Sequence, residues 1–148
     1  MDFEELVSDF ASRHGVDGLS IKDGAAAVDV DGIPVGISEA GGDIVATAVV
    51  GEPPVEGRAA FAEMLLEANI GSSAFFAKLP DGGRYVVSRR FSAATTDGAT
   101  FDAELEGLVN TAEAWRRILE DFRPAAEAAA GEEAAAGDAG GFGPFLQV

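Results

Sequence analysis

The sequence contains no cysteine and a single histidine, His14, among its 148 residues. The lack of cysteine excludes a disulfide framework, a thiolate zinc site and a cysteine nucleophile. His14 stands at the end of a predicted helix, where an imidazole complements the helix dipole, and it has no acidic partner placed to form a triad. We therefore expect no enzymatic activity and no cofactor or metal.

Phosphate-binding and calcium-binding motifs are also missing. The 19 glycines form neither a GxGxxG motif nor a Walker loop. Asp29-Val30-Asp31-Gly32 has a slight likeness to a calcium loop, but it lacks the other oxygen ligands and the closing glutamate of an EF-hand. Asp31-Gly32 lies between alternating apolar residues, and this pattern instead predicts a two-residue hairpin turn.

Basic residues are few. Ten lysines and arginines stand against 26 acidic residues, giving a net charge of −16 and a pI near 4.1. This charge repels nucleic-acid phosphates and anionic lipids and favours basic partners, although a generally acidic proteome would explain it equally well. Seven of the ten lie within 78–90 and 116–123, where we interpret them as charge balance rather than an anion site. No nucleic-acid binding is predicted.

Long apolar runs are absent. No stretch approaches the roughly 18 to 20 apolar residues that cross a bilayer, so no membrane insertion is expected. The opening MDFEELVSDF has acidic residues where a secretory signal needs basic ones. We therefore expect a cytoplasmic protein.

Apolar residues make up 47% of the chain, enough for one domain with a real core. Five of them near the amino terminus recur at helical spacing and predict an amphipathic helix: Phe3, Leu6, Val7, Phe10 and Ala11. The later predicted elements are strands at 26–30, 33–37 and 44–50, a helix at 58–69, strands at 74–79 and 85–91, and a helix at 101–122 capped by Thr100. Residues 19–22 are interpreted as a short leading piece of the first strand.

This order, helix-β3-helix-β2-helix, predicts an α+β fold with a five-stranded antiparallel sheet packed against helices. The predicted domain spans residues 1–123. Residues 124–148 have a different composition, because 125–141 are almost entirely alanine, glutamate and glycine with no apolar face. We predict a flexible acidic tail there, with an apolar tip at 142–148.

The helix at 58–69 and the segments after it carry a resemblance to a known family. The run Leu65-Leu66-Glu67-Ala68-Asn69-Ile70, the strands Ala-Phe-Phe-Ala at 74–77 and Tyr-Val-Val-Ser-Arg-Arg at 85–90, and Ala-Glu-x-Trp at 112–115 resemble class I type III secretion chaperones of the Tir chaperone (CesT) family. The resemblance covers about residues 1–123, and its most specific part is the Leu-Leu-Glu-Ala-Asn segment.

The resemblance implies a homodimer that binds the N-terminal chaperone-binding segment of a secreted effector and keeps it soluble and export-competent. The implied dimer interface comprises Phe61, Met64, Leu65, Ala68, Ala74, Phe75 and Phe76. The implied effector-binding residues are Phe3, Val7, Ile33, Val35 and Ile37. For any one of these positions a place in the core is an equally simple and more common explanation.

The tail departs from the family pattern, and its apolar residues suggest the hypothesis that it folds back into the effector groove. An alternative function is that of a YbjN-like regulatory or stress-response domain, which binds protein without a role in export. A ligand-binding enzyme of another type is a third alternative, disfavoured by the missing histidine and cysteine chemistry.

Overall fold

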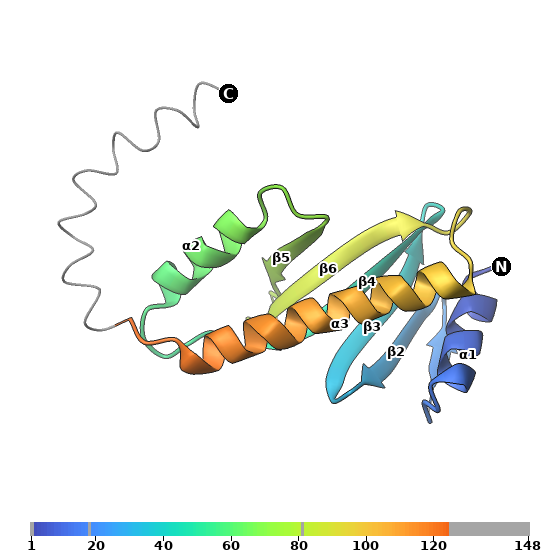
Figure 1. Cartoon of the computed structure of the whole chain (residues 1–148), viewed down its shortest axis with the longest axis horizontal. Coiled ribbons are helices and arrows are strands. Elements are labelled where there is room, and N and C mark those ends of the chain that lie inside the picture. Colours follow the sequence, from blue (N-terminus) through green and yellow to red (C-terminus); the bar gives the residue numbers. More distant parts are fainter. Residues whose placement is uncertain (1, 18, 81, 125–148) are drawn as a thin grey trace, which may run out of the picture.

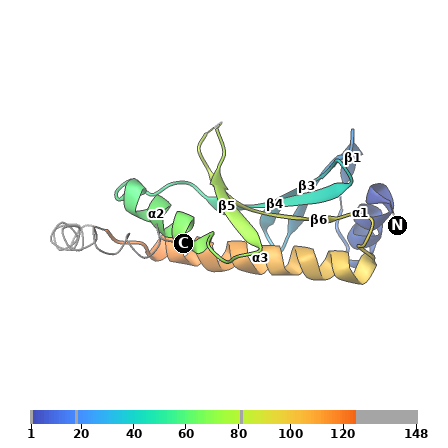
Figure 2. The same cartoon turned by 90° about the horizontal axis from the view of Figure 1, so that it is seen from above.

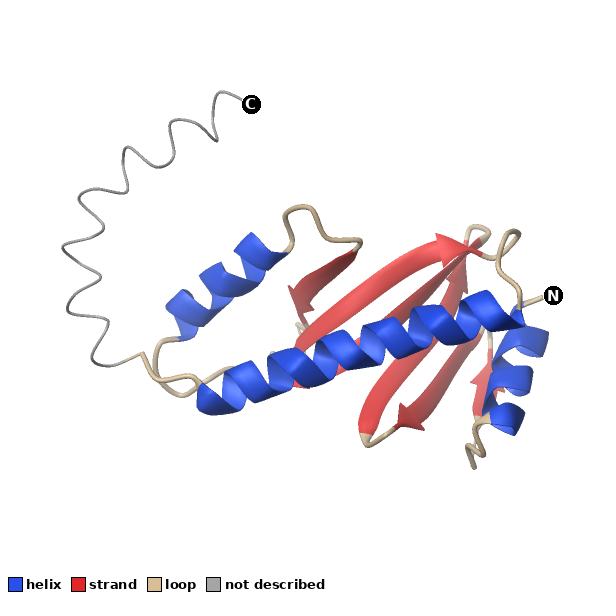
Figure 3. Cartoon of the chain, viewed as in Figure 1, coloured by secondary structure: helices blue, strands red, loops and turns tan. Residues whose placement is uncertain are grey.

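The computed structural model describes residues 2–17, 19–80 and 82–124, which form three helices and six strands (Figures 1 and 3). In chain order these are α1 (Phe3–Arg13), β1 (Ser20–Lys22), β2 (Ala25–Val30), β3 (Ile33–Ala40), β4 (Asp43–Gly51), α2 (Arg58–Ala68), β5 (Ala74–Lys78), β6 (Tyr85–Ser92) and α3 (Gly98–Asp121). The strands form one antiparallel sheet of order β1-β2-β3-β4-β6-β5. The predicted α+β class is confirmed.

The predicted strand count is wrong by one. Residues 20–22 do not lead into the first predicted strand but form the separate strand β1, which pairs with β2 at the edge of the sheet. Asp23 and Gly24 connect them, with φ angles of 53° and 70°. Asp31 and Gly32, between β2 and β3, have nearly the same conformation, with φ angles of 52° and 82°. Both connections are therefore two-residue turns with left-handed backbone angles, which match the twist of the paired strands. Only the second of these turns was predicted from the sequence.

The helices lie on one side of the sheet. Figure 2 shows α3 running along nearly its whole length, with α1 beside one end of α3 and α2 beside the other. The buried core fills the space between the sheet and these helices, and Leu6, Ile37, Ile44, Phe61 and Leu105 are among its fully enclosed side chains. No helix in the described ranges covers the opposite face of the sheet.

Side-chain caps fix where two of the helices begin. Asp2 and Glu5 form a reciprocal capping box at α1. At α3 the predicted cap, Thr100, is wrong. Asp97 caps the helix by accepting a hydrogen bond from the Thr100 N–H at 2.8 Å, so α3 begins three residues earlier than expected.

The predicted tail at 125–148 lies outside the described residues. Over 2–17, 19–80 and 82–124, no helix has the length and apolar character needed to cross a membrane.

Candidate protein-binding site

Helix α2 is anchored beside the end of the sheet by aromatic contacts. The ring of Phe61 stacks on Tyr85 of β6, with centroids 5.6 Å apart, and meets Trp115 and Phe122 edge-on at 6.2 and 5.1 Å. Phe76 of β5 also contacts Trp115 edge-on, at 5.0 Å. Such contacts add to the burial of large apolar area, so this aromatic cluster fixes the position of α2 against β5, β6 and α3.

Two large apolar side chains at the end of α2 are left uncovered by the described part of the chain. Leu66 of α2 and Ile70, two residues beyond the end of this helix, are each 65% exposed. Phe61 and Leu65 are the buried residues of α2. A helix that is apolar on more than one side is expected to be covered on more than one side. We call Leu66 and Ile70 the α2 apolar patch.

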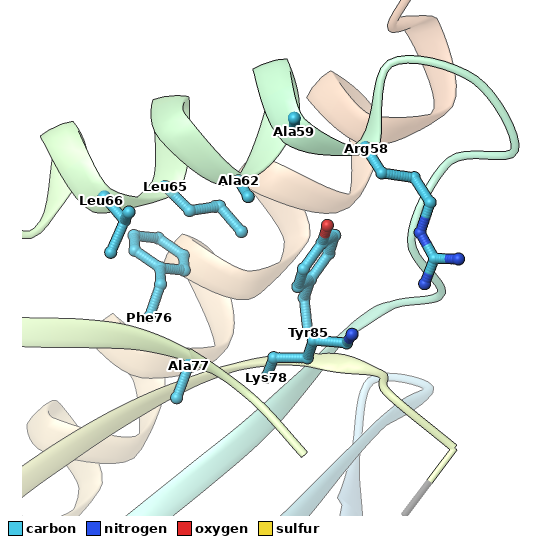
Figure 4. A pocket seen from close by; sticks show the side chains of 9 residues that line it. All are labelled: Arg58, Ala59, Ala62, Leu65, Leu66, Phe76, Ala77, Lys78 and Tyr85. Carbon is cyan, nitrogen blue, oxygen red and sulfur yellow. The ribbon is translucent and has the colours of Figure 1, made fainter. Parts of the chain in front are cut away.

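A cavity of about 330 Å³ continues this patch between α2 and the β5–β6 hairpin. In Figure 4, Ala62, Leu65 and Leu66 of α2 face the rings of Phe76 and Tyr85 across it. Arg58 lies beyond Tyr85 at one end. The lining is mainly apolar, so the cavity can accept an apolar side chain from another molecule.

The seven predicted dimer-interface residues all lie at this end of the molecule. Phe61, Leu65, Ala74 and Phe76 are buried, Met64 and Ala68 are half-buried, and Phe75 is exposed. Sequence reasoning missed Leu66 and Ile70 as interface candidates. The signal was present, because these two residues widen the apolar surface of the helix beyond a single stripe. The interface itself stays a prediction.

The five predicted effector-binding side chains are brought together in the core at the other end of the sheet. Phe3 and Val7 of α1 and Ile33, Val35 and Ile37 of β3 are each at most 4% exposed. In this conformation they support α1 on the sheet and do not face solvent. Their role in binding an effector stays a prediction, one that requires α1 to move.

The two edges of the sheet differ in how their main-chain groups are used. In antiparallel pairs, consecutive residues point their N–H and C=O groups alternately toward and away from the neighbouring strand. At the β1 edge, the two-residue turn makes Lys22 and Ala25 a hydrogen-bonded pair, so the N–H and C=O of Ile21 point outward. At the β5 edge, the outward groups of Phe76 are bound by the side chain of Asn69.

One row of residues across the face of the sheet without helices consists mainly of small side chains. Ala27, Gly36, Thr47, Ser88 and Phe75 lie side by side across β2, β3, β4, β6 and β5. The hydroxyls of Thr47 and Ser88 lie 2.7 Å apart and bond to each other, which satisfies the buried Ser88. Phe75, 48% exposed, is the one large apolar side chain in this row.

Several basic residues are paired as charge balance predicts. Arg89 contacts Glu104 of α3, Arg90 lies 3.4 Å from Asp43, and Arg117 is paired with Glu113. Partly exposed pairs of this kind contribute little each to stability. Arg116 donates to the carbonyl of Val50 at 3.3 Å and so joins α3 to the end of β4.

Over the described residues, the chain forms a six-stranded antiparallel sheet backed by helices, with an exposed apolar patch at one end and outward main-chain groups on the β1 edge at the other. Such features are typical of a protein-binding module. The model of the Tir chaperone protein (CesT) family matches residues 5–116, most of the described domain. The chain belongs to this family.

Solved structures of similar fold include secretion chaperones. The Yersinia pestis type III secretion chaperone SycH, solved with a fragment of YscM2, has a TM-score of 0.61 at 19% identity, covering 76% of this chain and 98% of its own. A chain of the ExsC–ExsE complex has a TM-score of 0.63 at 23% identity, covering 80% and 97%. A chain of the ExoU–SpcU complex of Pseudomonas aeruginosa has a TM-score of 0.60 at 17% identity, covering 78% and 99%. At these identities the similarities show the fold.

No curated protein matches the sequence. YbjN from E. coli, the alternative considered from the sequence, has a TM-score of 0.48 at 18% identity, too weak a likeness to build on.

Proposed function

We propose that this protein is a homodimeric type III secretion chaperone of the cytoplasm. It binds the N-terminal segment of a secreted effector and keeps that segment soluble and export-competent. Its action is binding, with no catalytic step. The observation that carries the proposal is the α2 apolar patch, which the described residues leave uncovered, on a domain that matches the family over residues 5–116.

The patch fits a second copy of the chain. Leu66 lines an apolar cavity and Ile70 lies just beyond the end of α2, so a two-fold axis near α2 would place the leucine and isoleucine of each subunit against the cavity of the other. Interfaces of this kind are self-complementary, and two-fold dimers are the commonest oligomers. ExsC–ExsE and ExoU–SpcU are complexes of two different chains, which supports the proposal that this protein also binds a different chain.

The β1 edge fits an extended effector segment. A strand that adds to a sheet edge gains main-chain hydrogen bonds whatever its sequence, and alternate side chains then find apolar surface nearby. Ile21 offers one outward N–H and one outward C=O at this edge, and its half-buried side chain packs against the core. The net charge of −16 favours segments that are basic and increases their association rate at low salt.

Co-expression with secreted proteins encoded nearby tests this function. The chain is expected to co-purify with one of them and to protect a stretch near its amino terminus from protease. Light scattering on the eluted complex is expected to give two copies of this chain for each effector. A chain that stays monomeric at high concentration and protects no segment would contradict the proposal.

A further inference from the structure

The β5 edge ends the sheet beside α2, and its pairing shows which main-chain groups point outward. The Leu79 N–H donates to the Arg84 carbonyl at 2.8 Å, so Leu79 and Arg84 form a hydrogen-bonded pair. By alternation, Ala77 and Phe75 also point their main-chain groups toward β6. The N–H and C=O of Phe76 therefore face away from the sheet, where an added strand would bind.

The side chain of Asn69 already binds both groups. Its Oδ1 accepts a hydrogen bond from the Phe76 N–H at 2.6 Å, and its Nδ2 donates one to the Phe76 carbonyl at 3.2 Å. One carboxamide thus makes the donor and acceptor contacts that a peptide unit of a neighbouring strand would make. The N–H of Ala74, two residues before Phe76, donates a hydrogen bond to the hydroxyl of Ser72 at 3.2 Å.

Helix α2 holds Asn69 in this position. Asn69 is the C-cap residue, with φ −69° and ψ −20°, and its own N–H reaches the carbonyls of Leu65 and Leu66 at 3.2 Å. Gly71 then turns the chain back toward β5 with a φ of 74°, a conformation that favours glycine. The helix and the turn thereby fix the main chain of Asn69, from which its short side chain reaches Phe76.

We propose that Asn69 determines where strands can add to this sheet. It closes the β5 edge, so an extended segment adds only at β1. The α2 end then joins a second subunit through side chains, and the sheet does not continue across the dimer. Unprotected edges pair with other chains, and natural proteins block them by specific devices. The assignments of the bound segment to β1 and of a second subunit to the α2 end rest on the proposed function, whereas the closure of the β5 edge does not.

Two substitutions in the chain alone test the closure. In Asn69→Ala the outward groups of Phe76 lose both partners, and alanine is compatible with the helical backbone at this position. Hydrogen exchange at the Phe76 amide is expected to accelerate roughly fivefold or more. Light scattering is expected to show species larger than the parent that grow with concentration.

A second substitution separates edge closure from simple stabilisation. Lys78 also points its N–H outward by the same alternation, and proline there removes the donor and obstructs an incoming strand. Asn69→Ala combined with Lys78→Pro is expected to return to the size of the parent while exchange at Phe76 stays fast. If Asn69 only stabilised the fold, Lys78→Pro would not reverse the association.

The proposal is overturned if Asn69→Ala keeps the parent size at every concentration, or if the double variant remains associated. Should Asn69→Ala not fold, Asn69→Asp takes its place, since a carboxylate accepts from the Phe76 N–H but cannot donate to its carbonyl. These measurements need no effector. A protein that shows the expected edge behaviour but protects no effector segment would contradict the proposed function and leave the closure by Asn69 standing.

Discussion

The carboxylate of Asp102 on α3 accepts hydrogen bonds from the guanidinium of Arg13 at the end of α1, with Arg13 Nη2 2.9 Å from Asp102 Oδ1. His14 Nε2 lies 3.2 Å from the other oxygen, Oδ2. The prediction that His14 has no acidic partner is therefore wrong, because folding brings Asp102 to it from a distant part of the sequence. The ring of Phe10 lies 4.5 Å from the histidine ring at a tilt of 33°, and it meets Phe101 edge-on. A polar contact with Asp102 and an aromatic contact with Phe101 therefore join α1 to the beginning of α3.

This contact predicts a loss of stability in acid. Burial of the Asp102 carboxylate opposes its ionisation, but hydrogen bonds from Arg13 and His14 outweigh burial, so the pKa of Asp102 lies below its usual value. A carboxylate with a lowered folded pKa stabilises the fold above its unfolded pKa of about 3.9 and loses that contribution as pH falls through the folded value. In urea unfolding, the free-energy difference between the parent and Asp102→Asn is expected to be level above about pH 5 and to shrink below about pH 4.

Asp17→Asn, at an exposed position, is the matched control for the loss of one carboxylate. A free-energy difference between the parent and Asp102→Asn that is the same at pH 3 and pH 7 would show that the Arg13–Asp102 contact contributes nothing through its charge.

The aromatic cluster predicts that Phe61 contributes more than exposed apolar residues to the free energy of unfolding. Phe61 is fully buried among Tyr85, Trp115 and Phe122. Phe61→Ala is expected to lower the free energy of unfolding by about 3 to 5 kcal/mol, because it removes apolar burial and leaves a cavity. Ile118→Ala, at a position 39% exposed, is the control and is expected to cost under about 1 kcal/mol. Urea unfolding at one fixed protein concentration measures both, and equal losses would contradict the anchoring role of Phe61.

The α2 apolar patch predicts which substitutions prevent formation of the proposed dimer. Leu66→Glu with Ile70→Glu places two charges in the proposed interface, where they would be desolvated without partners. The double variant is expected to elute as a folded monomer, with a dimer dissociation constant raised at least about a hundredfold. Ala60→Glu, which adds a charge at another exposed position of the same helix, is expected to leave the dimer intact. Monomer formation by both variants would point to a general effect of charge rather than to the patch.

The β1 edge predicts where the effector segment binds. Ile21→Pro removes the outward N–H of β1, since proline has no main-chain donor, and is expected to weaken binding of the co-purifying segment roughly tenfold. Ile21→Val keeps the N–H with a smaller side chain and is expected to bind nearly as the parent does. Calorimetric titration of the two variants measures the difference. Unchanged binding by a folded Ile21→Pro protein would place the segment elsewhere on the molecule.

The positions of the helices and most strands followed from local patterns. The stripe from Phe3 to Ala11 needed only 3.6-residue spacing, and Asp31-Gly32 needed only turn chemistry. Local signals also misled where two candidates were close together. Thr100 resembles a cap as well as Asp97 does, and only the folded chain shows which oxygen reaches which N–H.

The sequence by itself determined the class of this protein: its α+β order, its lack of cysteine chemistry, its acidity and its membership of a chaperone family. Only the tertiary structure decided which apolar residues remain exposed. Phe3 and Leu66 are both apolar residues on helices, yet one is enclosed beneath the sheet and the other is 65% exposed. Exposure depends on what other segments cover a residue, and that information is distributed over the whole chain. For the same reason the contact between Asn69 and Phe76, seven residues apart across a turn, became visible only when the helix and the strand edge were placed side by side.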